Sequence, residues 1–345
     1  MSTPVRVTTE ASAPEAWHRI LKEAEGATFC HLPGWRQVME GTMGHEYLFL
    51  AARSEEGELL GGLPLVRMRS PFFGHHLVSV PFLNYGGPLG PAAVRKALAE
   101  AAKHLAEESG ADRLVLRNRT ALSVDLDQGR DKVMVRLELG DDPEALWTNC
   151  FPAKLRSQIR RPQKEGMTCR FGPDERHDFY RVFAENMRDL GTPVHSLRLF
   201  DALAEVFPEE VIFGVVYHGE EPVAGGCGFL WGGEFEMTWA SALREYNRMA
   251  PNMLLYWSFM EKAIERGAAL FNFGRCTPGG GTHRFKRQWG GEDTALAWLE
   301  WDRHGSGAPS ADSWAYGAAM GVWRHLPLPL ANRLGPFLSR RIPTF

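Results

Sequence analysis

The sequence predicts an α/β protein built from two copies of one structural unit. Residues 46–66 and 210–230 each contain an apolar strand, a polar turn with paired glutamates and a second strand carrying Gly-Gly, which is typical of a β-hairpin. Residues 97–117 and 254–273 each contain an amphipathic helix, a Gly-Ala pair and an apolar strand. Because these elements recur in the same order, we infer two related units rather than a chance likeness between short strands.

The length of the chain agrees with two domains. Its 345 residues, 44% of them hydrophobic, exceed what one typical core accommodates. An Asp/Pro turn after Gly140 marks the start of a new helix. We therefore expect an N-terminal domain over 1–139, a C-terminal domain over 140–302 and a linker with a helical tail over 303–345.

Composition excludes several classes of function. The formal net charge of −3 provides no broad basic field, so we expect no DNA partner. Five separated cysteines without a C-x-x-C pair favour a reducing compartment over disulfides or zinc, and His75-His76 lack a third ligand, so we expect no metal. With neither a signal peptide nor an apolar run of about 20 residues, the sequence predicts a soluble, cytoplasmic protein.

A glycine-rich loop follows the strand predicted over 269–274. It lacks the Lys-Ser/Thr of a phosphate-binding loop and the dinucleotide fingerprint, so both nucleotide folds are rejected. If 282–289 is helical, Phe285 and Trp289 share a buried face and Lys286 lies at its rim, near the carboxyl end of a strand where α/β proteins bind ligands. The alternative is a solvated surface lysine.

A basic run occupies 153–164. Lys154, Arg156 and Arg160 project from a predicted helix whose apolar face is formed by Leu155 and Ile159. Such a helix suits a phosphate-bearing substrate or a tRNA backbone. A solvated basic surface is the alternative.

Three further residues are candidates for a substrate groove. Trp35 begins a short helix after Pro33, and Asn84-Tyr85 form a turn after a strand. The alternative is that these residues are simply core aromatics or turn residues. No G-x-S-x-G, H-E-x-x-H or catalytic triad is present, so we expect no covalent enzyme intermediate.

The tail over 323–341 combines apolar residues with flanking arginines. This pattern suits the edge of an anionic membrane, and packing against the second domain is the alternative.

The segments F-N-F-G-R at 271–275 and F-K-R-Q-W-G at 285–290, together with the doubled α/β pattern, resemble the FemAB family of the GNAT superfamily. The resemblance covers nearly the whole chain. It is strongest to the FemAB-related proteins associated with exopolysaccharide and PEP-CTERM systems.

The resemblance implies two tandem GNAT-like (acyl-CoA N-acyltransferase) domains with a helical C-terminal tail. It implies transfer of an aminoacyl or acyl group to an amine or hydroxyl of a peptidoglycan or exopolysaccharide precursor. The donor is expected to be aminoacyl-tRNA or acyl-CoA, with no tightly bound cofactor, and to enter between strands 234–241 and 269–274. The acceptor is expected to be a small molecule or a lipid-linked glycan or peptide, which would place the protein on the inner face of the membrane.

The resemblance also assigns roles. The family's F-K pair falls on Phe285 and Lys286, so Lys286, held over Phe285, is expected to stabilise the oxyanion of a tetrahedral intermediate. Beside this role from the family, we expect a backbone N–H of 236–240 to help, and His283 is a candidate base. The residues expected to bind substrate are Arg275, His283, Arg284, Trp289, Trp239, Lys154, Arg156, Arg160, Trp35, Asn84 and Tyr85.

Two departures from the family pattern bear on this reading. Asn272 replaces the acid of F-D-F-G-R, and Ala250-Pro251-Asn252 replace the glycines that hold an acyl-CoA pyrophosphate. Two alternatives therefore remain open. One is an acyl-CoA-dependent N- or O-acyltransferase that acts on a polysaccharide or small molecule, and the other is a non-catalytic binding protein on the same fold.

Overall fold

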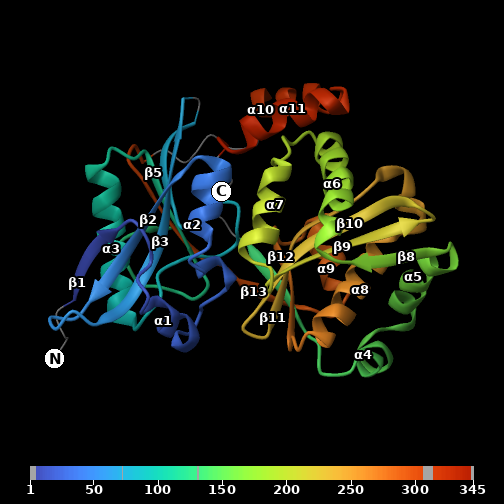
Figure 1. Ribbon diagram of the computed structural model, residues 1–345, viewed down its shortest axis with the longest axis horizontal. Coiled ribbons are helices and arrows are strands. Elements are labelled where there is room, and N and C mark those ends of the chain that lie inside the picture. Colours follow the sequence, from blue (N-terminus) through green and yellow to red (C-terminus); the bar gives the residue numbers. More distant parts are fainter. Residues whose placement is uncertain (1–4, 72, 130–131, 306–313, 343–345) are drawn as a thin grey trace. The chain divides into compact units, whose positions relative to one another are not determined.

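The computed structural model describes residues 5–71, 73–129, 132–305 and 314–342. These residues form two compact units, each built around a seven-stranded sheet (Figure 1). The first unit contains the described residues up to 129, with 296–305 and 340–342, and the second contains 132–295 and 314–339. The two-unit α/β architecture expected from the sequence is confirmed.

The first sheet has the strand order β1-β2-β3-β4-β5-β14-β6. Its strands are β1 (Arg6–Glu10), β2 (Glu46–Arg53), β3 (Leu59–Ser70), β4 (Gly74–Val78), β5 (Arg113–Asn118), β6 (Asp127–Gln128) and β14 (Ala297–Asp302). The helices of this unit are α1 (Trp17–Glu23), η1 (Phe29–His31), α2 (Trp35–Val38), η2 (Met39–Met43) and α3 (Ala92–Glu108).

The second sheet has the order β13-β7-β12-β11-β10-β9-β8. Its strands are β7 (Val133–Glu138), β8 (Met167–Phe171), β9 (Val211–His218), β10 (Glu221–Trp231), β11 (Glu234–Ala242), β12 (Leu270–Cys276) and β13 (Glu292–Ala295). The helices are α4 (Pro143–Ala145), η3 (Leu146–Cys150), α5 (Ala153–Lys164), η4 (Pro173–Glu175), α6 (Arg176–Leu190), α7 (Leu197–Val206), η5 (Arg244–Met249), α8 (Pro251–Glu265), α9 (Gly281–Arg287), α10 (Trp314–Trp323) and α11 (Leu328–Ser339).

The two units repeat one topology. Strands β1 to β5 are hydrogen-bonded in chain order, and so are β8 to β12. In each unit the last two of these strands are parallel and are joined by a long helix, α3 in the first and α8 in the second. The hairpins at 46–66 and 210–230 occupy matching positions, which confirms the repeat inferred from the sequence.

The units differ from the expected domain bounds because they exchange strands. β7 precedes the expected boundary at 139/140, yet it pairs with β12 and β13 in the second sheet. β14 lies in the segment assigned to the C-terminal domain, yet it pairs with β5 in the first sheet. Side-chain alternation shows that a segment is a strand, but it carries no information about which sheet supplies its hydrogen-bond partners.

The Gly-Gly pair in each repeat lets helices approach both faces of a strand. A Cβ on Gly225 would lie 3.1 Å from Phe179 Cα of α6, and one on Gly226 would lie 2.9 Å from the Phe259 ring of α8. Because successive residues of a strand point to opposite faces, α6 and α8 cover opposite sides of the second sheet. The core of this unit surrounds Phe235, Phe259 and Phe271.

The tail is helical, as expected. α10 and α11 contact α6 of the second unit, and the Nη2 of Arg324 donates to the Leu190 carbonyl. Part of the expected linker, 306–313, lies outside the described residues. Among the described residues, no helix has both the length and the apolar character needed to cross a bilayer.

Candidate active site

The parallel pairing of β11 and β12 ends halfway along both strands. The register pairs Glu234 with Leu270 and Glu236 with Asn272, and the ladder stops there. On its other edge β11 has a bulge, because Met237 and Trp239 lie opposite two consecutive residues of β10. A bulge bends its strand and increases its twist. β11 therefore diverges from β12 towards their carboxyl ends, the separation expected for strands 234–241 and 269–274.

A buried polar group lies at the last pairs of this ladder. Asn272 is opposite Glu236 on one side and Arg136 on the other, so the three side chains share a face of the sheet. The Nδ2 of Asn272 donates to Oε1 of Glu234 at 2.7 Å and to Oε2 of Glu236 at 3.2 Å. The Oδ1 of Asn272 accepts from the Gly274 N–H at 2.9 Å. Every polar atom of this amide side chain is therefore used.

The two buried glutamates differ in the cationic side chains that lie near their carboxylates. The Nη2 of Arg136 donates to both carboxylate oxygens of Glu234, at 3.1 and 2.9 Å. Burial nevertheless raises the pKa of Glu234, and Arg136 and Asn272 only partly oppose that shift. Glu236 is 2% exposed and lies close enough to Arg275 and Lys286 to interact with both charges.

Lys286 is buried, with 4% of its surface exposed. Its Nζ donates to the carbonyl oxygens of Gly274 at 2.7 Å and Arg275 at 2.9 Å. An ammonium has three N–H groups, so one donor remains beyond these two bonds. Burial lowers the pKa of Lys286 to about 8, with Cys276 and Glu236 opposing the shift and Arg275 adding to it. The side chain is thus a desolvated cation that can release its proton near neutral pH.

An aromatic cluster supports this lysine. Phe285 and Trp289 pack edge to face with ring centroids 6.3 Å apart, which confirms the shared face predicted from their spacing. Phe285 also meets Tyr256 of α8 edge to face at 5.0 Å. Trp289 is fully buried, whereas Phe285 is partly exposed. Aromatic packing therefore anchors α9 to α8, and this fixes the position of the Lys286 side chain.

Two of the expected substrate-binding residues hold the glycine-rich loop. The Gly279 N–H donates to Nδ1 of His283 at 3.1 Å, and the Nε2 of His283 lies 2.9 Å from Oδ2 of Asp293. The Nη1 of Arg284 donates to the Gly279 carbonyl at 2.8 Å. With both ring nitrogens of His283 engaged, this imidazole is tied to the loop instead of being open to a substrate.

Residues 151–287 match the family model described as Acetyltransferase (GNAT) domain. The solved structure described as FemX is similar with a TM-score of 0.63 and 14% identity, over 86% of this chain and 97% of that chain. A tandem GNAT protein from the clavulanic acid biosynthesis pathway is similar with a TM-score of 0.55 and 13% identity, over 87% and 98% of the two chains. The chain has a tandem GNAT fold.

Two further comparisons complete this picture. The structure of L-PGS from Bacillus licheniformis is similar to this chain with a TM-score of 0.54 and 15% identity, over 97% of this chain and 99% of that chain. No curated protein matches it in sequence. At these identities the structural likeness establishes the fold alone.

The remaining candidates in the second GNAT unit surround the end of the ladder or lie on α5. Burial lowers the pKa of Arg275 to about 10. The Trp239 ring packs edge to face on Phe200 of α7 at 5.4 Å. On α5, Lys154 and Arg160 are exposed, and Arg160 lies 5.1 Å from the Trp147 ring centroid.

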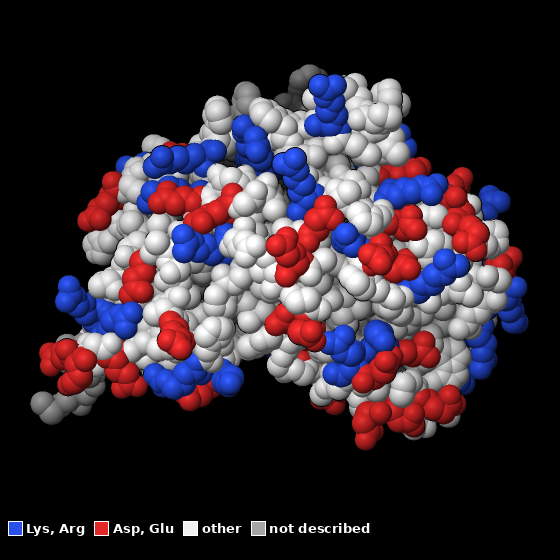
Figure 2. Space-filling model, viewed as in Figure 1, with Lys and Arg blue, Asp and Glu red and all other residues white. Residues whose placement is uncertain are grey.

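Arg156 of α5 is engaged by its own unit. Its Nη1 donates to the Trp147 and Thr148 carbonyls at 3.3 and 3.2 Å, so this guanidinium caps η3. The apolar face predicted for the helix is present, since Leu155 and Ile159 are both buried. Acidic and basic side chains are intermixed over the face shown in Figure 2, in line with the small net charge.

The other three candidates belong to the first GNAT unit and are buried there. Trp35 is 1% exposed and its Nε1 donates to the Phe29 carbonyl at 2.8 Å. The Asn84 carbonyl accepts from Trp298 Nε1 at 3.0 Å, and Tyr85 lies under the Arg119 guanidinium.

The sequence analysis did not identify Glu234, Glu236 or Arg136. The signal was the E-F-E segment at 234–236, where two acids alternate with a core aromatic on a strand. Such a pattern places both carboxylates on one face. Within the described residues, no three or more His, Cys, Asp or Glu side chains are grouped to hold a metal ion.

Proposed function

We propose that this protein is an acyltransferase of the FemAB type that transfers an aminoacyl or acyl group to an amine or hydroxyl of a cell-wall or exopolysaccharide precursor. The observation that carries the proposal is the desolvated Lys286, held by the Gly274 and Arg275 carbonyls where β11 and β12 separate. The fold shared with FemX and with a tandem GNAT protein supports it.

The proposed reaction is a direct displacement. The lone pair of the acceptor amine attacks the acyl carbonyl of an ester or thioester, and the carbonyl π electrons move to oxygen. The remaining N–H of Lys286 and a backbone N–H of 236–240 stabilise the resulting oxyanion. Collapse of the intermediate expels an alkoxide or a thiolate. One preorganised donor of this kind contributes about 3–4 kcal/mol to transition-state stabilisation.

Proton movement is the second task of the site. The attacking amine must lose a proton and the leaving group must gain one. Because its pKa is lowered to about 8, Lys286 can donate a proton to the leaving oxygen or sulfur and recover one from the amine. The aromatic packing of Phe285 on Tyr256 keeps the lysine in place during both steps.

The turn before α8 is relevant to which acyl donor the site binds. Ala250 caps this helix with a left-handed φ of 59°, and Pro251 is its first residue. Proline has no N–H, so this helix start offers one amide fewer to a pyrophosphate than a glycine-rich turn does. This favours aminoacyl-tRNA over acyl-CoA. The acyl-CoA-dependent N- or O-acyltransferase remains the second candidate, supported by the match of 151–287 to an acetyltransferase domain.

The test is product formation by the purified full chain. It is incubated separately with acetyl-CoA and with a mixture of charged tRNAs, in the presence of a lipid-linked precursor extract, and acceptors are analysed by mass spectrometry. A mass increase that equals one acyl or aminoacyl group and requires Lys286 supports the proposal and names the donor class. Binding of a donor without any transfer would instead favour a non-catalytic binding protein.

A further inference from the structure

The two units differ in the segment that links the first strand of their parallel pair to the crossover helix. In the first unit 79–89 leads from β4 towards α3, and in the second unit 243–250 leads from β11 to α8. Residues 79–89, here called the closing segment, are buried apart from the partly exposed Phe82, although they form no helix or strand beyond one isolated bridge. In the second unit, none of the residues of η5 is buried. Loops normally run over the surface, so a buried one fills a definite place in its fold.

Equivalent positions in the two units lie just beyond the parallel ladders. The ladders end at Val115 of β5 and at Asn272 of β12. Two residues further on are Arg117 and Gly274, which therefore occupy matching places. The groups that satisfy the backbone N–H and C=O of these two residues show what lies beside the strand in each unit.

In the first unit the closing segment satisfies Arg117. The Arg117 N–H donates to Ser79 Oγ at 2.7 Å, and the Arg117 carbonyl accepts from the Gly87 N–H at 3.1 Å. The fully buried Arg117 side chain also donates to the carbonyls of Val80 and Leu83. Val80 has a φ of 47°, and such strain in a β-branched residue persists where surrounding contacts determine it. The closing segment is therefore held firmly against β5.

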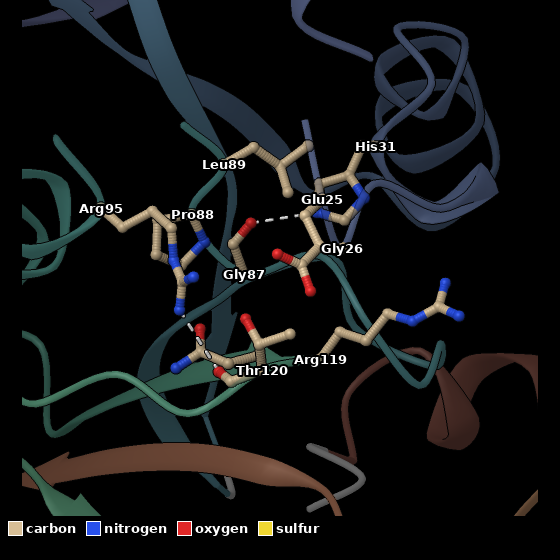
Figure 3. Close-up of a pocket in the computed structure, with 10 residues that line it drawn as sticks. Glu25, Gly26, His31, Gly87, Pro88, Leu89, Arg95, Arg119 and Thr120 are labelled. Atoms are coloured by element: carbon tan, nitrogen blue, oxygen red, sulfur yellow. Dashed lines mark hydrogen bonds between the residues drawn. The ribbon is translucent and has the colours of Figure 1, made fainter. Parts of the chain in front are cut away.

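The closing segment continues across to β3. Leu89 and Gly62 of β3 exchange backbone hydrogen bonds of 2.9 and 3.1 Å. A Cβ on Gly87 would lie 2.2 Å from Asn118 Oδ1, so the segment packs directly on the residue that ends β5. The cavity left beside it holds about 10 Å³, which is room for roughly one water (Figure 3). Beyond the end of β4, the chain itself therefore fills the space between β3 and β5.

In the second unit, side chains take these roles. The Gly274 N–H donates to Asn272 Oδ1 at 2.9 Å, and the Gly274 carbonyl accepts from Lys286 Nζ at 2.7 Å. The chain that leaves β11 stays with β10, since the Leu243 N–H donates to the Val223 carbonyl at 2.9 Å. The end of β12 is thus lined by an amide and an ammonium, where the end of β5 is lined by the backbone of the closing segment.

We infer that the protein binds a single acyl donor per chain, in the second unit, because the closing segment occupies the corresponding place in the first. The inference rests on the proposed function for the nature of the ligand, and it adds the number of donor sites and the reason for that number. Both units keep the parallel pair and the crossover helix, so the topology alone would allow two sites. In the first unit that place is packed with the chain's own backbone.

The test is hydrogen exchange of the full chain, followed by mass spectrometry. In the free chain, peptides that cover 79–89 and 113–118 should exchange as slowly as the central strands, because their amides are buried and hydrogen-bonded. With saturating acetyl-CoA or, separately, a mixture of charged tRNAs, exchange should slow about tenfold in 236–242 and 270–276 and stay unchanged in both first-unit peptides. Rapid exchange of 79–89 in the free chain, or donor-dependent slowing there, would overturn the inference.

The same measurement separates this inference from the proposed function. If neither donor slows exchange in either unit, the proposed donors are wrong. The free chain still decides whether the closing segment fills the first unit, because that result needs no donor.

Gly87→Ala tests the packing of the closing segment. Its Cβ would meet Asn118 Oδ1, so exchange in 79–89 should become about tenfold faster than in the native chain. Gly41→Ala in η2 is the matched control, since a Cβ there meets nothing within 4 Å. If Gly87→Ala does not fold, Arg117→Met replaces it, because that change removes the bonds to the Val80 and Leu83 carbonyls. Equal exchange in the variant and the control would show that the segment is not packed against β5.

Discussion

The side-chain amide nitrogen of Asn272 lies 2.7 Å from Oε1 of Glu234, between two buried carboxylates. An ionised aspartate, the charged form of the residue found in the related F-D-F-G-R pattern, would have no hydrogen to offer either of them. The amide instead donates to Glu234 and Glu236 and accepts from the Gly274 N–H. The asparagine is thus matched to the E-F-E segment of the neighbouring strand, and it joins β11 to β12 at the last pair of their ladder.

Asn272→Asp should therefore destabilise the protein in a pH-dependent way. Repulsion from Glu234 and Glu236 would raise the pKa of the new carboxyl in the folded state above its unfolded value of about 3.9. The folded state would hold the extra proton, so the stability of the variant relative to the native chain falls as pH rises above about 4. We expect a loss of about 1–3 kcal/mol at pH 8. Urea unfolding at pH 5 and pH 8 measures it, and an equal loss at both would contradict this account.

Lys286→Met tests the proposed oxyanion role directly. Methionine keeps the length of the stem and removes the charge, so kcat should fall about 10²–10³-fold with KM nearly unchanged. Lys262→Met is the matched control, since Lys262 on α8 forms a surface ion pair with Glu265. If a folded Lys286→Met variant keeps kcat within about twofold of the native value, the proposed mechanism is wrong and only the fold assignment stands.

The pH dependence of the rate should report the same lysine. Because burial lowers the pKa of Lys286 to about 8, the ammonium is lost as pH rises through that value. kcat should fall above pH 8, and the falling limb should shift to higher pH in Lys286→Arg, whose guanidinium stays charged. A stopped assay between pH 6 and pH 10 checks this. Rates that stay constant up to pH 10 would show that the charge on Lys286 is not used.

The basic helix α5 should contribute to binding a phosphate-bearing substrate. Lys154 and Arg160 are exposed, whereas Arg156 already caps η3. The double variant Lys154→Glu with Arg160→Glu should therefore raise KM and reduce its dependence on salt, because screened phosphate contacts carry that dependence. Lys262→Glu serves as the control for the change in charge. If KM depends on salt concentration in the same way in the double variant and the native chain, α5 is only a solvated surface helix.

We propose that the tail contacts a membrane surface. On α11, Leu330, Leu334 and Phe337 are 43%, 42% and 48% exposed and lie on one side of the helix at i, i+4 and i+7. Exposed apolar residues near arginines suit the boundary of an anionic bilayer, where a lipid-linked acceptor would lie. Deleting the tail would uncover α6, so we replace all three residues by serine. Flotation with vesicles containing phosphatidylglycerol should be lost in the variant but kept in a Val322→Ser control. Equal flotation of all three proteins would refute membrane contact by α11.

The sequence by itself determined the repeated unit and its local elements. Alternating and helical periodicity placed the hairpins at 46–66 and 210–230 and the crossover helix α8, because these patterns depend on neighbours a few residues apart. The i, i+4 spacing of Phe285 and Trp289 likewise gave their shared face, and a resemblance in the same segment led to Lys286.

Only the tertiary structure decided which sheet each strand joins and how the polar side chains are satisfied. β7 and β14 are exchanged between the sheets, since a strand's pattern does not specify its hydrogen-bond partners. Asn272, Glu234 and Arg136 come from three strands distant in sequence, and their pairing follows from register. The position of Lys286 depends on the carbonyls of β12, and its lowered pKa depends on the desolvation that packing imposes. Spacing along a chain cannot supply these, because desolvation is a property of the assembled fold.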